Sequence, residues 1–100
     1  MADPHIELIV LETPKFPLGH LIATPNALAE INSDEILVAL GRHAAGDWGL
    51  VDAEDKHAND RALIEGTRLL SAYETQRGTR FWLITEWDRS VTTILLPEDY

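Results

Sequence analysis

The final third of the chain, Thr67–Leu96, decides the fold; it reads TRLLSAYETQRGTRFWLITEWDRSVTTILL. β-branched and aromatic residues dominate it, and two short polar joins interrupt it, Gln76–Gly78 and Asp88–Ser90. These residue types favour strands, and joins this short favour neighbouring strands that run antiparallel. The sequence therefore predicts a three-stranded antiparallel meander over Thr67–Thr75, Thr79–Trp87 and Val91–Leu96.

Turn lengths set the expected register of this meander. With Arg77 and Gly78 as the two central turn residues, Tyr73 lies opposite Trp82. With a second turn of three residues, Ile84 lies opposite Ile94. This register makes both faces of the meander apolar. One face carries Leu69, Tyr73, Trp82, Ile84, Ile94 and Leu96, and the other carries Leu70, Ala72, Phe81, Leu83, Trp87, Val91 and Leu95.

Two apolar faces are more than the rest of a small chain covers easily, because a half-exposed antiparallel sheet alternates apolar and polar residues. Either the N-terminal segment folds across the second face, or that face contacts another protein chain. We therefore predict a partner-binding surface, for a homodimer or a protein partner, that includes Trp82, Ile84 or Ile94.

Upstream of the meander, the pattern predicts one strand, Leu18–Thr24, and three helices. Each helix begins at a side chain that suits an N-cap, namely Thr24, Ser33 and Asp52. Pro25 follows the first cap, and Gly66 fits the end of the third helix. The expected order is β-α-α-α-β-β-β, a small α+β domain in which the C-terminal meander packs against helices.

The length of 100 residues indicates one domain. We expect residues 16–100 to form it and residues 1–15 to form an N-terminal arm or an extra edge strand. Ile6–Leu11 has the length of a strand, and Pro14 and Pro17 favour an extended link behind it. No basic leader and no apolar run of about 20 residues occurs, so we expect a cytoplasmic protein without membrane contact.

The composition is strongly acidic: 17 Asp and Glu stand against 8 Lys and Arg, for a net charge of −9. Such a charge repels nucleic acid and attracts basic protein surfaces, so we expect no direct nucleic-acid binding. The chain has no cysteine, which excludes disulfides, zinc–thiolate sites and thiol nucleophiles.

Carboxylates gather in one segment, which runs from the turn Gly46–Gly49 into the third helix. They are Asp47, Asp52, Glu54, Asp55 and Asp60, with His57 among them. Carboxylate oxygens bind hard cations, which leaves a small metal-dependent hydrolase or nuclease as one alternative. Their spacing matches no metal motif, and a helix N-terminus prefers the same residues, so we predict capping, with no metal, no cofactor and no catalytic residue.

Two further residues are expected to be structural. Trp48 lies in the turn Gly46–Gly49, between two glycines. Asn59 falls on the apolar face of the third helix, where a buried amide needs hydrogen-bond partners. We predict that Asn59 bonds backbone in a neighbouring loop, most simply this turn.

Several short motifs occur together. They are Gly46-Asp47-Trp48-Gly49, Asn59-Asp60, Ile84-Thr85-Glu86, Asp88-Arg89-Ser90, Thr92-Thr93 and Leu95-Leu96-Pro97-Glu98-Asp99-Tyr100. With these motifs, residues 16–100 resemble a family of small uncharacterised bacterial proteins often encoded on plasmids and other mobile elements. The resemblance implies no activity and no catalytic residues.

The sequence favours a non-enzymatic, acidic accessory protein that binds a protein partner. Its sharpest version is an inhibitor of a nucleic-acid-processing defence system, an anti-restriction or anti-CRISPR protein, because an acidic protein competes with DNA for a basic channel. Besides the residues of the meander, Asp47, Asp52, Asp55 and Asp60 are candidates for the partner contact. A structural homo-oligomer is the remaining alternative.

Overall fold

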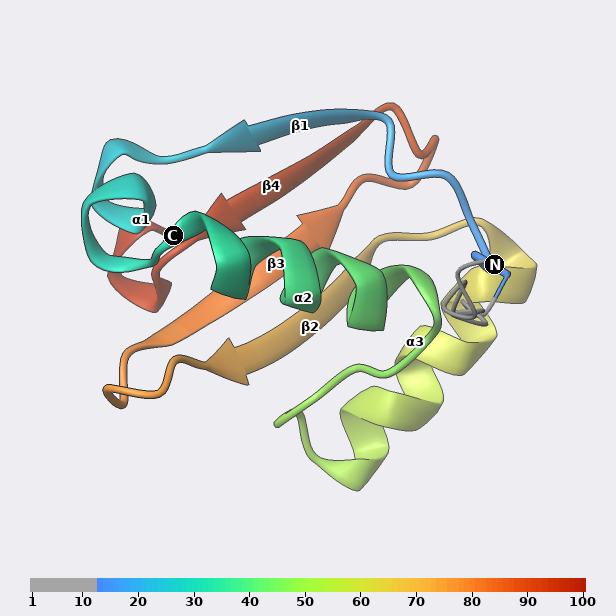
Figure 1. Cartoon of the computed structure of the whole chain (residues 1–100). Coiled ribbons are helices and arrows are strands. Elements are labelled where there is room, and N and C mark those ends of the chain that lie inside the picture. The colour runs from blue at the N-terminus through green and yellow to red at the C-terminus, as the bar shows by residue number, and fades with distance from the viewer. Residues whose placement is uncertain (1–12) are drawn as a thin grey trace, which may run out of the picture.

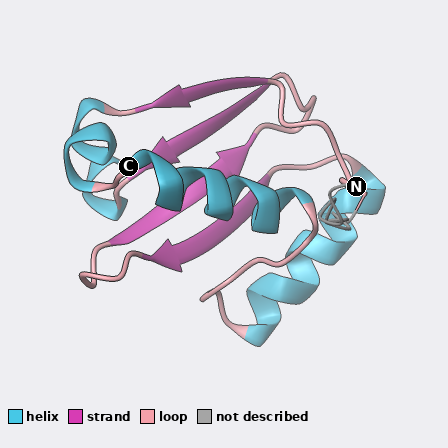
Figure 2. Ribbon diagram, in the orientation of Figure 1, coloured by secondary structure: helices cyan, strands magenta, loops and turns pink. Residues whose placement is uncertain are grey.

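A four-stranded sheet forms the centre of the fold in the computed structural model, which describes residues 13–100. The elements are β1 (His20–Ala23), α1 (Pro25–Glu30), α2 (Ser33–Ala44), α3 (Ala53–Glu65), β2 (Leu69–Glu74), β3 (Arg80–Thr85), β4 (Val91–Leu95) and the 3₁₀-helix η1 (Pro97–Asp99). The predicted α+β class is confirmed (Figure 2). The predicted strand at Ile6–Leu11 lies outside the described residues.

The sheet is mixed, with the strand order β1-β4-β3-β2. β2, β3 and β4 pair antiparallel, whereas β1 pairs in parallel with β4. The sheet therefore contains the predicted meander and one further strand, because β1 pairs with the free edge of β4. Figure 1 shows α2 lying across one face of the sheet, α1 at the end of β1, and α3 beyond β2.

The first hairpin turn has three residues instead of two. The N–H of Gly78 donates to the carbonyl of Thr75, the N–H of Thr75 donates to the carbonyl of Thr79, and Gly78 has φ +90°. A type I turn followed by a left-handed glycine has this form. The predicted register is therefore wrong by one residue, and Tyr73 lies opposite Phe81.

The second turn is also longer than expected. The N–H of Glu86 donates to the carbonyl of Val91, so four residues, Trp87–Ser90, form the loop. Ile84 then lies opposite Thr93 and Ile94 opposite Leu83. A shift of one residue moves a strand's side chains to the other face.

The shifted register separates the predicted contact residues. Ile94 faces α2 with Leu83 and Phe81, whereas Trp82 and Ile84 lie on the opposite face of the sheet. Ile84 and Ile94 are each only 3% exposed. The prediction that Trp82, Ile84 and Ile94 lie on one face of the sheet is therefore wrong.

Side-chain caps fix the helix starts. The hydroxyl of Thr24 accepts from the N–H of Ala27 at 3.1 Å, and Asp52 accepts from the N–H of Asp55 at 2.8 Å. α2 differs from the prediction, because Asn32, one residue before Ser33, is its N-cap. Either residue type satisfies an N–H group of the first turn, so the sequence alone did not distinguish them.

The core between α2 and the sheet contains residues from the first two helices and from strands β2, β3 and β4. It consists of Ala27, Ile31, Ala39, Leu40, Tyr73, Phe81, Leu83, Ile94 and Leu96. A second cluster, formed by Phe16, Trp48, Ala62 and Leu69, joins α3 to the edge of the sheet. The first cluster packs α2 against the sheet, and the second packs α3 beside it.

The outer side of β2 is closed by other parts of the chain. The N–H of Ala72 donates to the carbonyl of Trp48 at 3.1 Å, and the N–H of Leu50 donates to the carbonyl of Ala72 at 2.7 Å. The Asn59 amide donates to the Leu70 carbonyl at 2.8 Å and accepts from the Leu70 N–H at 3.1 Å. Asn59 is thus buried and bonds to backbone, but its partner is strand β2 and not the turn Gly46–Gly49.

We expect Asn59→Ala to lower the free energy of unfolding by about 1–3 kcal/mol, because it leaves both backbone groups of Leu70 without their partner. Asn26→Ala is the matched control, since the Asn26 amide bonds to Asp99 at an exposed position and its loss should cost about 0.5 kcal/mol or less. Urea denaturation measures both. Equal unfolding midpoints for Asn59→Ala and the native chain would contradict the prediction.

Candidate protein-binding surface

Helix α2 is apolar on more than its buried side. Ile36, Ala39, Leu40 and His43 face the sheet at helical spacing, and on the outer side Leu37 and Val38 are each 65% exposed. Surface helices normally place polar residues on the outer side. On either side of this helix the surface is hollowed, and we call the two depressions the acidic hollow and the apolar hollow.

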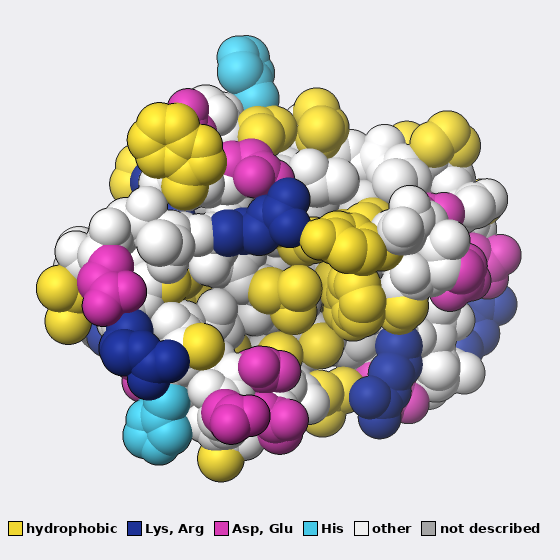
Figure 3. Space-filling model, turned by 180° about the vertical axis from the view of Figure 1, so that it is seen from behind, with side chains coloured by type: hydrophobic (Ala, Val, Ile, Leu, Met, Phe, Trp, Pro, Cys, Tyr) yellow, Lys and Arg dark blue, Asp and Glu magenta, His cyan; other side chains and the backbone are white. Residues whose placement is uncertain are grey.

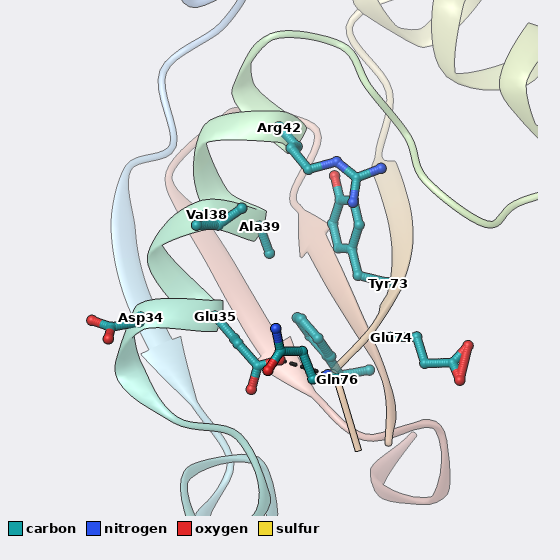
Figure 4. Close-up of a pocket in the computed structure, with 9 residues that line it drawn as sticks. Asp34, Glu35, Val38, Ala39, Arg42, Tyr73, Glu74 and Gln76 are labelled. Carbon is teal, nitrogen blue, oxygen red and sulfur yellow. Dashed lines mark hydrogen bonds between the residues drawn. The ribbon is translucent and has the colours of Figure 1, made fainter. Parts of the chain in front are cut away.

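The acidic hollow lies between α2 and strands β2 and β3 and has a volume of about 270 Å³. Its lining is Asp34, Glu35, Val38, Ala39, Arg42, Tyr73, Glu74, Gln76 and Phe81. In Figure 4, Asp34 lies on one flank and Glu74 on the other, with Glu35 between them. Glu35 is held in place because its carboxylate accepts from the N–H of Gln76 at 2.8 Å.

One basic side chain reaches this hollow, but its charge is matched. Arg42 lies over the Tyr73 ring, 4.7 Å from its centroid, and its Nε donates to Asp47 at 2.7 Å. This ion pair raises the pKa of Arg42 and lowers the pKa of Asp47. Burial raises the pKa of Tyr73 to about 12, so its ring is neutral. The Glu74 carboxylate lies 4.0 Å from Arg80 Nε in a long, exposed ion pair, so Asp34 and Glu35 contribute most of the negative charge above the apolar floor.

The apolar hollow lies on the other side of α2, between α2, α1 and β1, with a volume of about 280 Å³. It is lined by Leu21, Ile22, Ala23, Leu28, Ser33, Ile36, Leu37, Leu40 and Ile94. None of these residues carries a charge. Leu21 and Ile22 are about half exposed, and Leu28 and Leu37 are more exposed still.

Beneath α2 lies a buried chain of polar side chains. His43 Nδ1 is 2.5 Å from Ser71 Oγ, and His43 Nε2 is 2.8 Å from Thr85 Oγ1. Thr85 Oγ1 is 2.7 Å from Thr92 Oγ1, which donates to the Leu18 carbonyl. Each hydroxyl has one proton, so Thr85 donates to Thr92, His43 donates from Nε2 to Thr85, and Ser71 donates to Nδ1. The neutral Nε2–H tautomer satisfies every member.

This network combines a serine with a histidine but is closed to substrates, since His43, Ser71, Thr85 and Thr92 are each 0% exposed. Burial, aided by the charge of Arg89, lowers the pKa of His43 to about 4. Near the C-terminus of α2 a charged histidine would interact favourably with the helix dipole, but the structure makes His43 a neutral core residue. The sequence signal was the polar residues at the α2-facing positions of three strands.

The acidic residues of the segment Asp47–Asp60 have structural partners. Asp47 pairs with Arg42, Asp52 caps α3, and Asp60 accepts from Trp48 Nε1 at 3.0 Å. Asp55 lies in the first turn of α3, where the helix dipole favours it. Within residues 13–100, no three His, Asp or Glu side chains lie close enough together to hold a metal ion.

The face of the sheet opposite α2 is only partly exposed (Figure 3). On this face the ring of Tyr100 meets Trp82 edge-on, with centroids 5.7 Å apart, and the Tyr100 hydroxyl accepts from Arg68 at 2.8 Å. Arg68 also pairs with Glu86. Of the two predicted contact residues on this face, Ile84 is buried and Trp82 is packed against Tyr100.

No protein-family model, curated protein or solved structure matches the chain. Of the helices formed by residues 13–100, none has the length and apolar character needed to cross a membrane.

Proposed function

We propose that this domain is a non-enzymatic accessory protein that binds a basic region of a protein partner through the acidic hollow. The observation that supports this function is the combination of an apolar floor, formed by Ala39 and Phe81, with Asp34, Glu35 and Glu74 at the rim. A lysine or arginine side chain fits such a hollow, because its aliphatic stem packs on apolar surface while its charged end meets carboxylates.

The overall charge supports the same partner chemistry. A net charge of −9 steers a basic protein toward the domain and opposes direct binding to nucleic acid. In its sharpest form, the proposal is a cytoplasmic, mobile-element protein that occupies the basic channel of a nucleic-acid-processing defence complex. Such a protein would act against restriction or CRISPR systems by excluding DNA or RNA from that channel.

Two charge-matched variants test this proposal. The hollow variant carries Asp34→Asn, Glu35→Gln and Glu74→Gln, and the control carries Glu30→Gln, Glu54→Gln and Glu65→Gln. Both lose three negative charges, but only the first changes the acidic hollow. We expect a protein captured from host lysate by the native chain and by the control to bind the hollow variant at least about tenfold more weakly, because its rim charges are gone.

The captured protein is then purified and titrated with all three forms at two salt concentrations. Equal weakening of both variants would mean that net charge alone attracts the protein, and the hollow would then have no specific role. Capture of no protein by the native chain would contradict the proposed function itself.

A further inference from the structure

The two edge strands of the sheet, β2 and β1, differ in what covers their outer backbone groups. The β2 side is closed by Trp48, Leu50 and Asn59, whereas among residues 13–100 strand β1 pairs only with β4. An unpaired strand edge is a template on which another strand adds. The position of β1 therefore calls for an account of what pairs with it.

The hydrogen bonds to β4 show which backbone groups of β1 face outward. The N–H of His20 donates to the Ser90 carbonyl at 2.9 Å, and the N–H of Thr24 donates to the Ile94 carbonyl at 3.0 Å. Backbone groups alternate in direction along a strand. The N–H and C=O groups of Leu21 and Ala23 therefore point away from the sheet.

Natural proteins protect such edges with short strands, lysine, proline or a bulge. β1, which reads His-Leu-Ile-Ala, is short but has no lysine, proline or bulge. Its side chains are instead apolar and accessible. Leu21 lies on the α2 side and is 49% exposed, and Ile22 lies on the opposite side and is 52% exposed. Leu28 and Leu37 extend this surface along the apolar hollow.

The distribution of charge favours a second copy of the chain as the partner of β1. The stretch Phe16–Ala29 contains no Asp, Glu, Lys or Arg, although the chain as a whole carries −9. Two copies of such a chain repel each other wherever their acidic surfaces meet, and they approach at least cost where no charge is present. A basic partner gains no charge attraction here and finds it instead at the acidic hollow.

We propose that β1 pairs antiparallel with β1 of a second copy, which joins the two four-stranded sheets into one continuous sheet. The outward groups place Leu21 opposite Ala23 of the second copy, with Ile22 facing its own counterpart at the two-fold axis. The apolar surface formed by Leu21, Leu28 and Leu37 of each copy becomes buried against the other. This self-association is independent of the proposed function, because the acidic hollow lies on the other side of α2.

A single-cysteine experiment tests the register. The full chain has no cysteine, so Ile22→Cys introduces a unique thiol. Residues that face each other in a non-hydrogen-bonded antiparallel pair have Cβ atoms about 4.5–5.5 Å apart, close to the separation that a disulfide needs. We expect Ile22→Cys to form a covalent dimer under mild oxidation.

Ile64→Cys is the matched control, since Ile64 is 88% exposed on α3, away from β1. It should remain largely monomeric under the same oxidation. Equal cross-linking of both variants, or none with Ile22→Cys, would overturn the proposed pairing.

Sedimentation over a wide concentration range gives an independent test. We expect the native chain and Ile64→Lys to dimerise with similar dissociation constants. Ile22→Lys should raise that constant by roughly 100-fold or more, because two ammonium groups then face each other at the axis. A far-ultraviolet spectrum checks that the variant is folded, as the exposure of Ile22 leads us to expect.

Leu21→Pro separates strand pairing from side-chain packing, because it removes an N–H that points away from β4 and is compatible with an edge strand. It should weaken the dimer much more than Leu21→Ala does. A native chain that stays monomeric throughout, or equal effects of Leu21→Pro and Leu21→Ala, would overturn the proposal and leave the protein-binding function untouched.

Discussion

Gly49→Ala is expected to lower the free energy of unfolding by about 3 kcal/mol or more, since positive φ and overpacking each cost a non-glycine residue about 1–3 kcal/mol. Gly49 has φ +73°, and an added Cβ would overlap the carbonyl oxygen of Ala72 and lie 2.8 Å from the Tyr73 ring. That carbonyl accepts from the N–H of Leu50. The substitution therefore separates the loop from β2 as well as straining its backbone.

Gly41→Ala is the matched control. Gly41 lies inside α2, and an added Cβ there meets nothing within 4 Å. Alanine is favoured over glycine in a helix by roughly 0.5–1 kcal/mol, so this variant should be slightly more stable than the native chain. Urea denaturation measures the stability of both variants. Equal unfolding midpoints for Gly49→Ala and Gly41→Ala would contradict the expected clash.

Acidification is expected to remove about 3 kcal/mol of stability through His43 alone, because each unit of pKa shift corresponds to 1.36 kcal/mol. The pKa of His43 is about 4 in the folded chain and 6.5 for an ordinary histidine. The unfolded chain therefore binds the extra proton first, so stability is fully present above the ordinary value and is lost as the pH falls from about 6.5 to about 4.

The network explains why protonation is unfavourable. A proton on Nδ1 would point at Ser71, whose hydroxyl now donates to that nitrogen at 2.5 Å, so Ser71 would have to redirect its proton inside a closed core. Denaturation midpoints at a series of pH values measure the loss. Nuclear magnetic resonance of the ring follows its protonation directly.

His43→Gln is the control for the acid titration. Carboxylates such as Asp47 also lose stabilising interactions in acid, because Arg42 holds the pKa of Asp47 low in the folded chain. Removing the imidazole leaves those contributions in place, so the variant should show a shallower decline than the native chain between about pH 6.5 and pH 4. Parallel curves, or a His43 ring that protonates above about pH 6 while the chain stays folded, would contradict the network.

The sequence was informative where local chemistry decides structure. The N-caps Thr24 and Asp52 and the left-handed Gly66 at the end of α3 act within a few residues, and their patterns predicted the helices well. The predicted register of both hairpins was wrong because the same residue types suit turns of two, three or four residues. Turn geometry depends on backbone hydrogen bonds, such as that from Glu86 to Val91, which composition does not encode.

The acidic hollow could not be predicted from the sequence, because residues far apart in the chain form it. Asp34 and Glu35 are 40 residues or so from Glu74 and Gln76, and no local pattern brings them to one hollow. The sequence pointed instead to the carboxylates between Asp47 and Asp60, which α3 and Trp48 use internally. Leu37 fits the helical period of Ile36, Leu40 and Ala44, yet it is 65% exposed because the sheet covers only one side of α2.

The closure of β2 by Asn59 and the loop Trp48–Leu50 determines the valence of the chain as a building block. A unit with two open sheet edges polymerises without limit, whereas a unit with one open edge has a single bond to form. For the sheet that residues 13–100 form, pairing at β1 would therefore stop at two copies, and the joined sheet would have no remaining open edge from which a filament grows. In that assembly both α2 helices lie on the same side of the joined sheet, so a partner with two basic segments meets two acidic hollows at once.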